Sequence, residues 1–121
     1  MDESSRMPRN RRKSPRISAK IQAEVMVQLL GSQTKHEYRT ANISTSGMLL
    51  TTLSGRKPIF NSQSILEVWL HCDSQEVFCI AKFVRKQDET KFAIKITDID
   101  DRNFELYQQI ILNHMPEPKA P

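Results

Sequence analysis

The chain has 121 residues, a hydrophobic content of 38% and a mean hydropathy of -0.53, which together fit one soluble domain with a modest core. No apolar run approaches the ~18 residues of a membrane-spanning helix, and the charged, polar start of the chain lacks the apolar segment of a secretory signal. The two cysteines, Cys72 and Cys79, are too few for a disulfide framework. We therefore expect a cytoplasmic protein.

The positive charge is concentrated near the start of the chain. The formal net charge is +4, and residues 1–20 contain seven Lys and Arg against two acidic residues, a balance of +5 that leaves -1 for the remainder. An anionic partner bound by this segment is therefore expected. Residues 1–16 also contain two prolines and no apolar periodicity, so we expect a flexible arm.

Apolar alternation predicts six short strands after residue 17. Turn residues separate them, as at Gly31 and at the Asp73-Ser74 and Asp88-Glu89 pairs. A loop over residues 54–64 carries Ile59 and Phe60, which we expect to enter the core. The expected strands cover residues 21–29, 38–43, 48–53, 65–70, 77–84 and 92–96.

The end of the chain has the pattern of a helix. Its apolar positions have helical spacing, and Asp98 or Asp100 can cap its first turn, while Pro116 ends it. The apolar positions are Phe104, Tyr107, Ile110 and Ile111. Six strands and one terminal helix indicate a mainly β fold, a small six-stranded antiparallel β-barrel with a C-terminal α-helix.

Two short motifs carry groups suited to a ligand. The first is Arg12-x-x-x-Arg16, and the second is Asn42-x-Ser44-x-x-Gly47, at the turn between two expected strands. Arginine pairs bidentately with phosphate or with guanine O6 and N7, and it stacks on purine rings. Asn and Ser supply neutral donors and acceptors, and Gly permits positive φ and a close approach to the backbone.

In this order, the two motifs resemble the signature of the PilZ domain family, bacterial receptors for cyclic di-GMP. The resemblance covers about Arg11 to Asn113, with asparagine in place of the family's usual aspartate, an accepted variant. It implies three segments: a basic arm over residues 1–10, the domain over 11–115 and a loose tail over 116–121. It implies ligand contacts from Arg11, Arg12, Arg16, Asn42, Ser44 and Gly47, with Leu49 and Arg85 as lesser candidates.

The resemblance also implies a function. It points to a receptor or adaptor that changes its surface on binding cyclic di-GMP and regulates a downstream protein in motility, biofilm formation or virulence. Arginine at position 11 suits two stacked ligands per chain. Ser44 has no nearby sequence partner that suggests a nucleophile's base, and no paired carboxylates stand out, so we expect neither catalysis nor a cofactor.

Two alternatives stay open at the level of sequence. One is a nucleic-acid-binding barrel that uses the basic arm, disfavoured by a slightly acidic barrel without an evident row of surface aromatic residues. The other is a PilZ-like adaptor that binds protein without any ligand. Trp69 is expected to pack in the barrel. The cysteines and the three histidines lack metal-site spacing, so we expect no metal: His36, His71 and His114.

Overall fold

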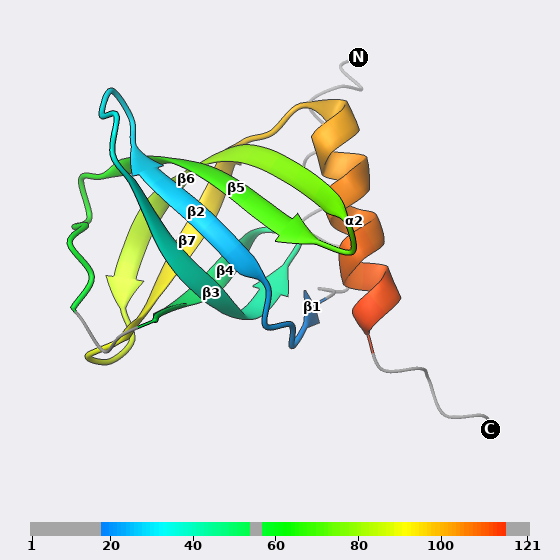
Figure 1. Ribbon diagram of the computed structural model, residues 1–121, viewed down its shortest axis with the longest axis horizontal. Helices are drawn as coiled ribbons and strands as arrows, with labels where there is room; N and C mark the ends of the chain where they lie inside the picture. Colours follow the sequence, from blue (N-terminus) through cyan, green and yellow to red (C-terminus); the bar gives the residue numbers. More distant parts are fainter. Residues whose placement is uncertain (1–17, 54–56, 116–121) are drawn as a thin grey trace, which may run out of the picture.

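The computed structural model describes residues 18–53 and 57–115 (Figure 1). The segments expected to form the arm and the tail lie outside these residues. The described ranges contain strands β1 (Ser18–Ala19), β2 (Glu24–Leu29), β3 (Lys35–Ser44), β4 (Gly47–Thr52), β5 (Ile65–Cys72), β6 (Gln75–Lys86) and β7 (Lys91–Asp98), and helix α2 (Asp101–His114).

Six of the strands close into a barrel. Their order is β3-β2-β5-β6-β7-β4, every neighbouring pair is antiparallel, and pairing of β4 with β3 closes the ring. The short strand β1 lies outside the ring, on the edge of β3 (Figure 1). The fold class predicted from the sequence is confirmed, with β1 as an additional strand.

The barrel interior is filled by alternate side chains of the strands. Three aromatic side chains (Tyr38, Phe60 and Phe83) pack there around Phe92, which stacks on Phe83 at 5.5 Å between ring centroids and meets Tyr38 edge-on at 5.1 Å. Phe60 enters from the loop before β5, as predicted, and is 7% exposed. The same prediction was wrong for Ile59, which is 63% exposed.

Helix α2 packs against β6 and β1, alongside the barrel (Figure 1). Asp100 caps it, because Oδ1 accepts the backbone N–H of Asn103 at 2.8 Å. Its buried residues are Tyr107, Ile110 and Ile111, whereas Phe104 is only half-buried. Within the described ranges no helix has the length and apolar character that crossing a membrane requires.

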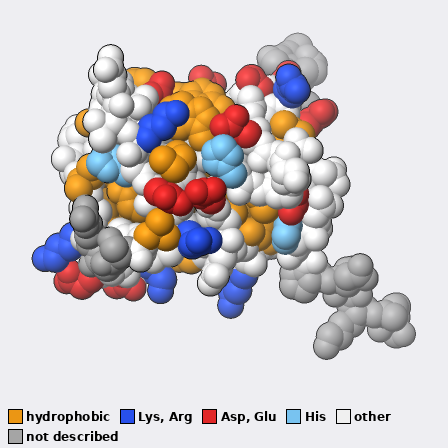
Figure 2. Space-filling view, in the orientation of Figure 1, with side chains coloured by type: hydrophobic (Ala, Val, Ile, Leu, Met, Phe, Trp, Pro, Cys, Tyr) orange, Lys and Arg blue, Asp and Glu red, His pale blue; other side chains and the backbone are white. Residues whose placement is uncertain are grey.

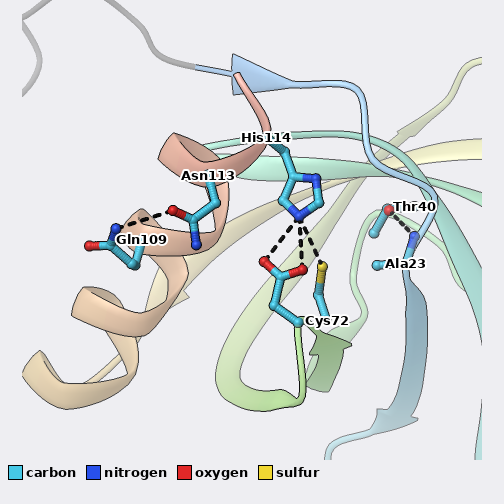
Figure 3. Close-up of polar contacts among 7 residues, drawn as sticks. Ala23, Thr40, Cys72, Gln109, Asn113 and His114 are labelled. Atoms are coloured by element: carbon cyan, nitrogen blue, oxygen red, sulfur yellow. Dashed lines mark hydrogen bonds and ion pairs between the residues drawn. The ribbon is translucent and has the colours of Figure 1, made fainter. Parts of the chain in front are cut away.

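The strand predicted over residues 21–29 is shorter than its apolar pattern. Ile21 and Ala23 are buried, yet β2 begins at Glu24. The hydroxyl of Thr40 donates to the Ile21 carbonyl and accepts the Ala23 N–H at 2.9 Å (Figure 3). The buried Thr40 side chain therefore bonds to the backbone of the segment between β1 and β2. Ile21 and Ala23 are buried although they precede the first residue of β2.

Candidate functional site

The second motif forms a tight turn between β3 and β4. Pairing places Ser44 opposite Gly47 and Asn42 opposite Leu49. The register shifts between Thr40 and Asn42, so Asn42 and Ser44 lie on the strand face opposite the buried Ile43. Two adjacent strands thus bring together four of the residues predicted from the sequence.

Strand β1 runs beside this turn. Ser18 pairs with Ser44, and Ala19 pairs with Ile43. The first described residues therefore lie directly beside the second motif in space. The predicted contacts Arg11, Arg12 and Arg16 lie outside the described residues.

The carbonyl groups of the turn are held from two sides. Ser46 O accepts the Ile96 N–H of β7 at 2.9 Å. The Tyr107 hydroxyl of α2 bonds to Ser44 O and lies 3.0 Å from Gly47 O. Burial raises the pKa of Tyr107, so its hydroxyl stays a neutral donor. The turn is consequently attached to both the barrel wall and the helix.

Gly47 is required by a neighbouring backbone rather than by its own φ. A Cβ atom on Gly47 would lie 2.2 Å from Ile94 O and 3.2 Å from Lys95 Cα, both on β7. Among the glycines of the described ranges only Gly31 has positive φ, at 88°. The positive φ expected for Gly47 was therefore wrong, and the backbone that approaches this glycine is that of β7.

The polar side chains of the turn retain bonding capacity. Asn42 Oδ1 is buried and has no hydrogen-bond partner within the described part of the chain. Ser44 Oγ has only long contacts, 3.4 Å to Ser46 Oγ and 3.4 Å to Gly47 O. A buried amide oxygen without a donor is costly, so Asn42 Oδ1 is a candidate acceptor for a donor outside the described residues.

Two lysines continue the row of residues that starts at the turn. Gly47 pairs with Lys95 of β7, which pairs with Lys82 of β6. Both lysines are exposed, and neither forms an ion pair within residues 18–53 and 57–115. Like charges directly opposite one another destabilise a sheet, and a bound anion would relieve the repulsion. Neither lysine was predicted from the sequence.

A second row connects the lesser candidates. Asn42 pairs with Leu49, Leu49 with Ala93, and Ala93 with Arg85. Arg85 is exposed, three strands from Asn42, and strand spacing limits this separation to about 14 Å. The structure thus brings Leu49 to the turn and leaves Arg85 at the far end of the same outer surface.

The opposite wall has a different character. In the ring, β5 lies three strands from β4 in either direction. On β5, Trp69 is half-buried and packs on Phe78 of β6 at 5.2 Å, with Lys35 Nζ 4.3 Å from its ring centre. Figure 2 shows hydrophobic, acidic, basic and histidine side chains interspersed over β2 and β5. Trp69 therefore packs outside the barrel, and an aromatic pair does occur on its surface, away from the turn.

The family model of the PilZ domain matches residues 10–113. The chain therefore belongs to the PilZ domain family. A comparison with curated protein sequences found no match.

Solved structures share the fold at low sequence identity. The inhibitor of motility MotI/DgrA of Bacillus subtilis has a TM-score of 0.66 and 14% identity over 84% of this chain, which spans only 50% of that protein. The PilZ domain of CeSA from a cellulose-synthesising bacterium has a TM-score of 0.63 and 13% identity, covering 83% and 97% of the two chains. The PilZ domain of YcgR from Escherichia coli, solved with c-di-GMP, has a TM-score of 0.62 and 15% identity, covering 86% and 91%.

Proposed function

We propose that this chain is a receptor for cyclic di-GMP, bound between the Arg12–Arg16 segment and the β3–β4 turn. The observation that carries the proposal is the pairing of β1 with β3 at the turn, Ser18 opposite Ser44. Arg16 precedes Ser18 by two residues, and two residues of chain span at most about 7 Å. Chain connectivity therefore keeps the two motifs close, and the structural neighbour YcgR, solved with c-di-GMP, supports the ligand.

The groups near the turn suit the chemistry of this ligand, which has two phosphates and two guanines. Arg12 and Arg16 provide charge-assisted bonds to phosphate or to guanine O6 and N7. Asn42 Oδ1, which lacks a donor in the described structure, can accept a guanine N–H. Leu49, opposite Asn42, offers an apolar contact for a base.

Isothermal titration with cyclic di-GMP tests the proposal. Arg12→Ala and Arg16→Ala should each weaken binding roughly ten- to a hundred-fold, because a hydrogen bond to a charged group contributes about 1.5–3 kcal/mol. Arg102→Ala is the matched control, since Arg102 is exposed on the first turn of α2 and should leave affinity unchanged. Wild-type affinity in both arm variants would remove the Arg12–Arg16 segment from the site.

We place two ligands on each chain at saturation. A stacked pair brings four phosphates together, and such a cluster needs additional cations. Arg11 supplies one, and the opposed Lys82 and Lys95 beside Gly47 supply two more. Titration of protein of known active concentration should give a ratio of two, moving toward one in Arg11→Leu. A ratio of one in the wild type would contradict the stoichiometry and leave the receptor assignment intact.

The two alternative functions predict different binding behaviour. A nucleic-acid-binding barrel should bind unrelated RNA with an affinity that falls steeply as salt is raised, whereas a site for one dinucleotide should ignore that RNA. The aromatic pair Trp69–Phe78 would be the stacking surface, so Trp69→Ala should weaken RNA binding and leave cyclic di-GMP binding unchanged. A ligand-independent adaptor should bind neither.

The output of such a receptor is a change in surface read by another protein. Tyr107 joins the turn to α2, so a ligand that shifts the Ser44 or Gly47 carbonyl acts directly on the helix. We propose a cytoplasmic, non-enzymatic adaptor whose downstream protein partner acts in motility, biofilm formation or virulence. Pull-down of partners with and without cyclic di-GMP, compared between wild type and Tyr107→Phe, tests this route.

A further inference from the structure

Three metal-binding types of side chain converge where the β5–β6 hairpin meets the last turn of α2 (Figure 3). His114 Nε2 lies 2.9 Å and 3.0 Å from the two carboxylate oxygens of Asp73 and 3.9 Å from Cys72 Sγ. The donor atoms of the three residues all lie within 4.8 Å of one another. His114 is 41 residues from Asp73, so only the fold brings them together.

A single nitrogen faces all of these partners. The Nε2 atom carries either one proton or one lone pair, so a hydrogen bond to the Asp73 carboxylate leaves only a weak, shared contact with the Cys72 sulfur at 3.9 Å. In a catalytic triad, one ring nitrogen of the histidine would contact the nucleophile Cys72 and the other would contact the orienting Asp73. Here the same nitrogen faces both residues.

The distances suit a shared cation. Zinc binds sulfur, nitrogen and oxygen at about 2.0–2.3 Å, which places tetrahedral ligands roughly 3.3–3.6 Å apart. The contacts of His114 Nε2, at 2.9 Å to Asp73 and 3.9 Å to Cys72, lie on either side of this range. Shifts below about 1 Å would therefore bring both His114 contacts into this range. A thiolate with an imidazole disfavours magnesium and calcium.

We propose that Cys72 Sγ, Asp73 and His114 Nε2 form a binding site for one Zn²⁺ per chain. The surface hollow lined by residues 71–76 adjoins these ligands and leaves a fourth position for water or another ligand. The ion would link the β5–β6 hairpin to the C-terminal end of α2. No metal was predicted from the sequence because the cysteines and histidines lack metal-site spacing; Cys72 and His114 are 42 residues apart. This site is independent of the cyclic di-GMP proposal.

Zinc titration of untagged protein against a chromophoric chelator tests the site. We expect one ion per chain and at least a tenfold loss of affinity in both His114→Gln and Cys72→Ser, since even outer-shell substitutions cost about 10- to 100-fold. His114 is exposed at the helix end, so His114→Gln should stay folded if Cys72→Ser does not. The matched control is His36→Gln, which lies on β3 and should retain wild-type affinity.

Cobalt supplies a second, spectroscopic readout. A Co²⁺ complex of the wild type should show the charge-transfer absorption of a cobalt–thiolate bond, and His36→Gln should keep it while Cys72→Ser loses it. The proposal is overturned if the wild type fails to bind Zn²⁺ at micromolar concentration. It is equally overturned if Cys72→Ser and His114→Gln bind like the wild type, or if the cobalt complex lacks the thiolate band.

Discussion

Replacing Gly47 by alanine tests how the ligand turn is built. The added Cβ would lie 2.2 Å from Ile94 O, whereas even attractive contacts between carbon and oxygen are about 3.3–3.6 Å long. The obstacle is backbone, so no side-chain rotation relieves it. Strand β4 must therefore move away from β7 by about 1 Å.

This displacement has a calculable cost. The Ile96 N–H to Ser46 O bond, now 2.9 Å, would lengthen to about 4 Å and be lost. Loss of one such bond costs about 0.5–1.5 kcal/mol, and the strain of overpacking adds about 1–3 kcal/mol. We expect Gly47→Ala to destabilise the domain by about 2–4 kcal/mol, or roughly 8–16 °C in Tm at about 4 °C per kcal/mol. Cyclic di-GMP affinity should fall as the turn moves.

Gly31 provides the matched control. Its φ of 88° is unfavourable for alanine, yet a Cβ there would have no atom within 4 Å. Gly31→Ala should therefore cost only the left-handed strain, about 1–2 kcal/mol, and leave ligand affinity unchanged. Thermal melts and titrations of both variants decide the matter. A Gly47→Ala protein that melts no lower than Gly31→Ala and binds normally would refute the proposed role of the β7 backbone.

Three further predictions follow from contacts near the site. Thr40→Val leaves a buried N–H and a buried carbonyl unpaired, so it should lower the free energy of unfolding, measured in denaturant, by about 1–3 kcal/mol. Thr52→Val is the control, because it removes a buried hydroxyl that has no partner in the described residues and should be neutral or stabilising. Equal losses of stability in the two variants would contradict this prediction. Tyr107→Phe should lower Tm and weaken cyclic di-GMP binding, and unchanged values for both would remove the link to α2. The hydrogen bond from the Asn103 N–H lowers the pKa of Asp100. The cap therefore stabilises the fold fully above the unfolded pKa of about 3.9, and it stabilises less as pH falls through the folded pKa. The Tm difference between wild type and Asp100→Ala should shrink in acid, and a constant difference would contradict the role of Asp100 as the cap.

The barrel could be predicted because each strand has one buried face and one exposed face. Alternation along β2 and β5 reports which face is buried, and this pattern is local to each strand. The helix could also be predicted from the sequence, because Asp100 can cap it and Tyr107, Ile110 and Ile111 have helical spacing. These features need no knowledge of which strands pair.

The features that could not be predicted from the sequence depend on which strands pair in the barrel. Strand β1 has two residues and no period of its own, and it exists because β3 is longer than β2 and offers a free edge at Ser44. The opposed Lys82 and Lys95 become meaningful only when β6 and β7 are in register. Gly47 was recognised as special, but the reason lies on β7, which the local sequence of the turn cannot reveal.

Helix α2 connects the two proposed sites of this molecule. Tyr107 reaches the ligand turn, and His114 reaches the β5–β6 hairpin. These residues are seven apart, which is close to two helical turns and about 10 Å, so they lie on similar faces of the helix. The helix is therefore attached at its middle to the turn and at its end to the hairpin. Because a packed helix moves as a unit, a shift of the Gly47 carbonyl would move the exposed face of α2, where Leu112 is 52% exposed.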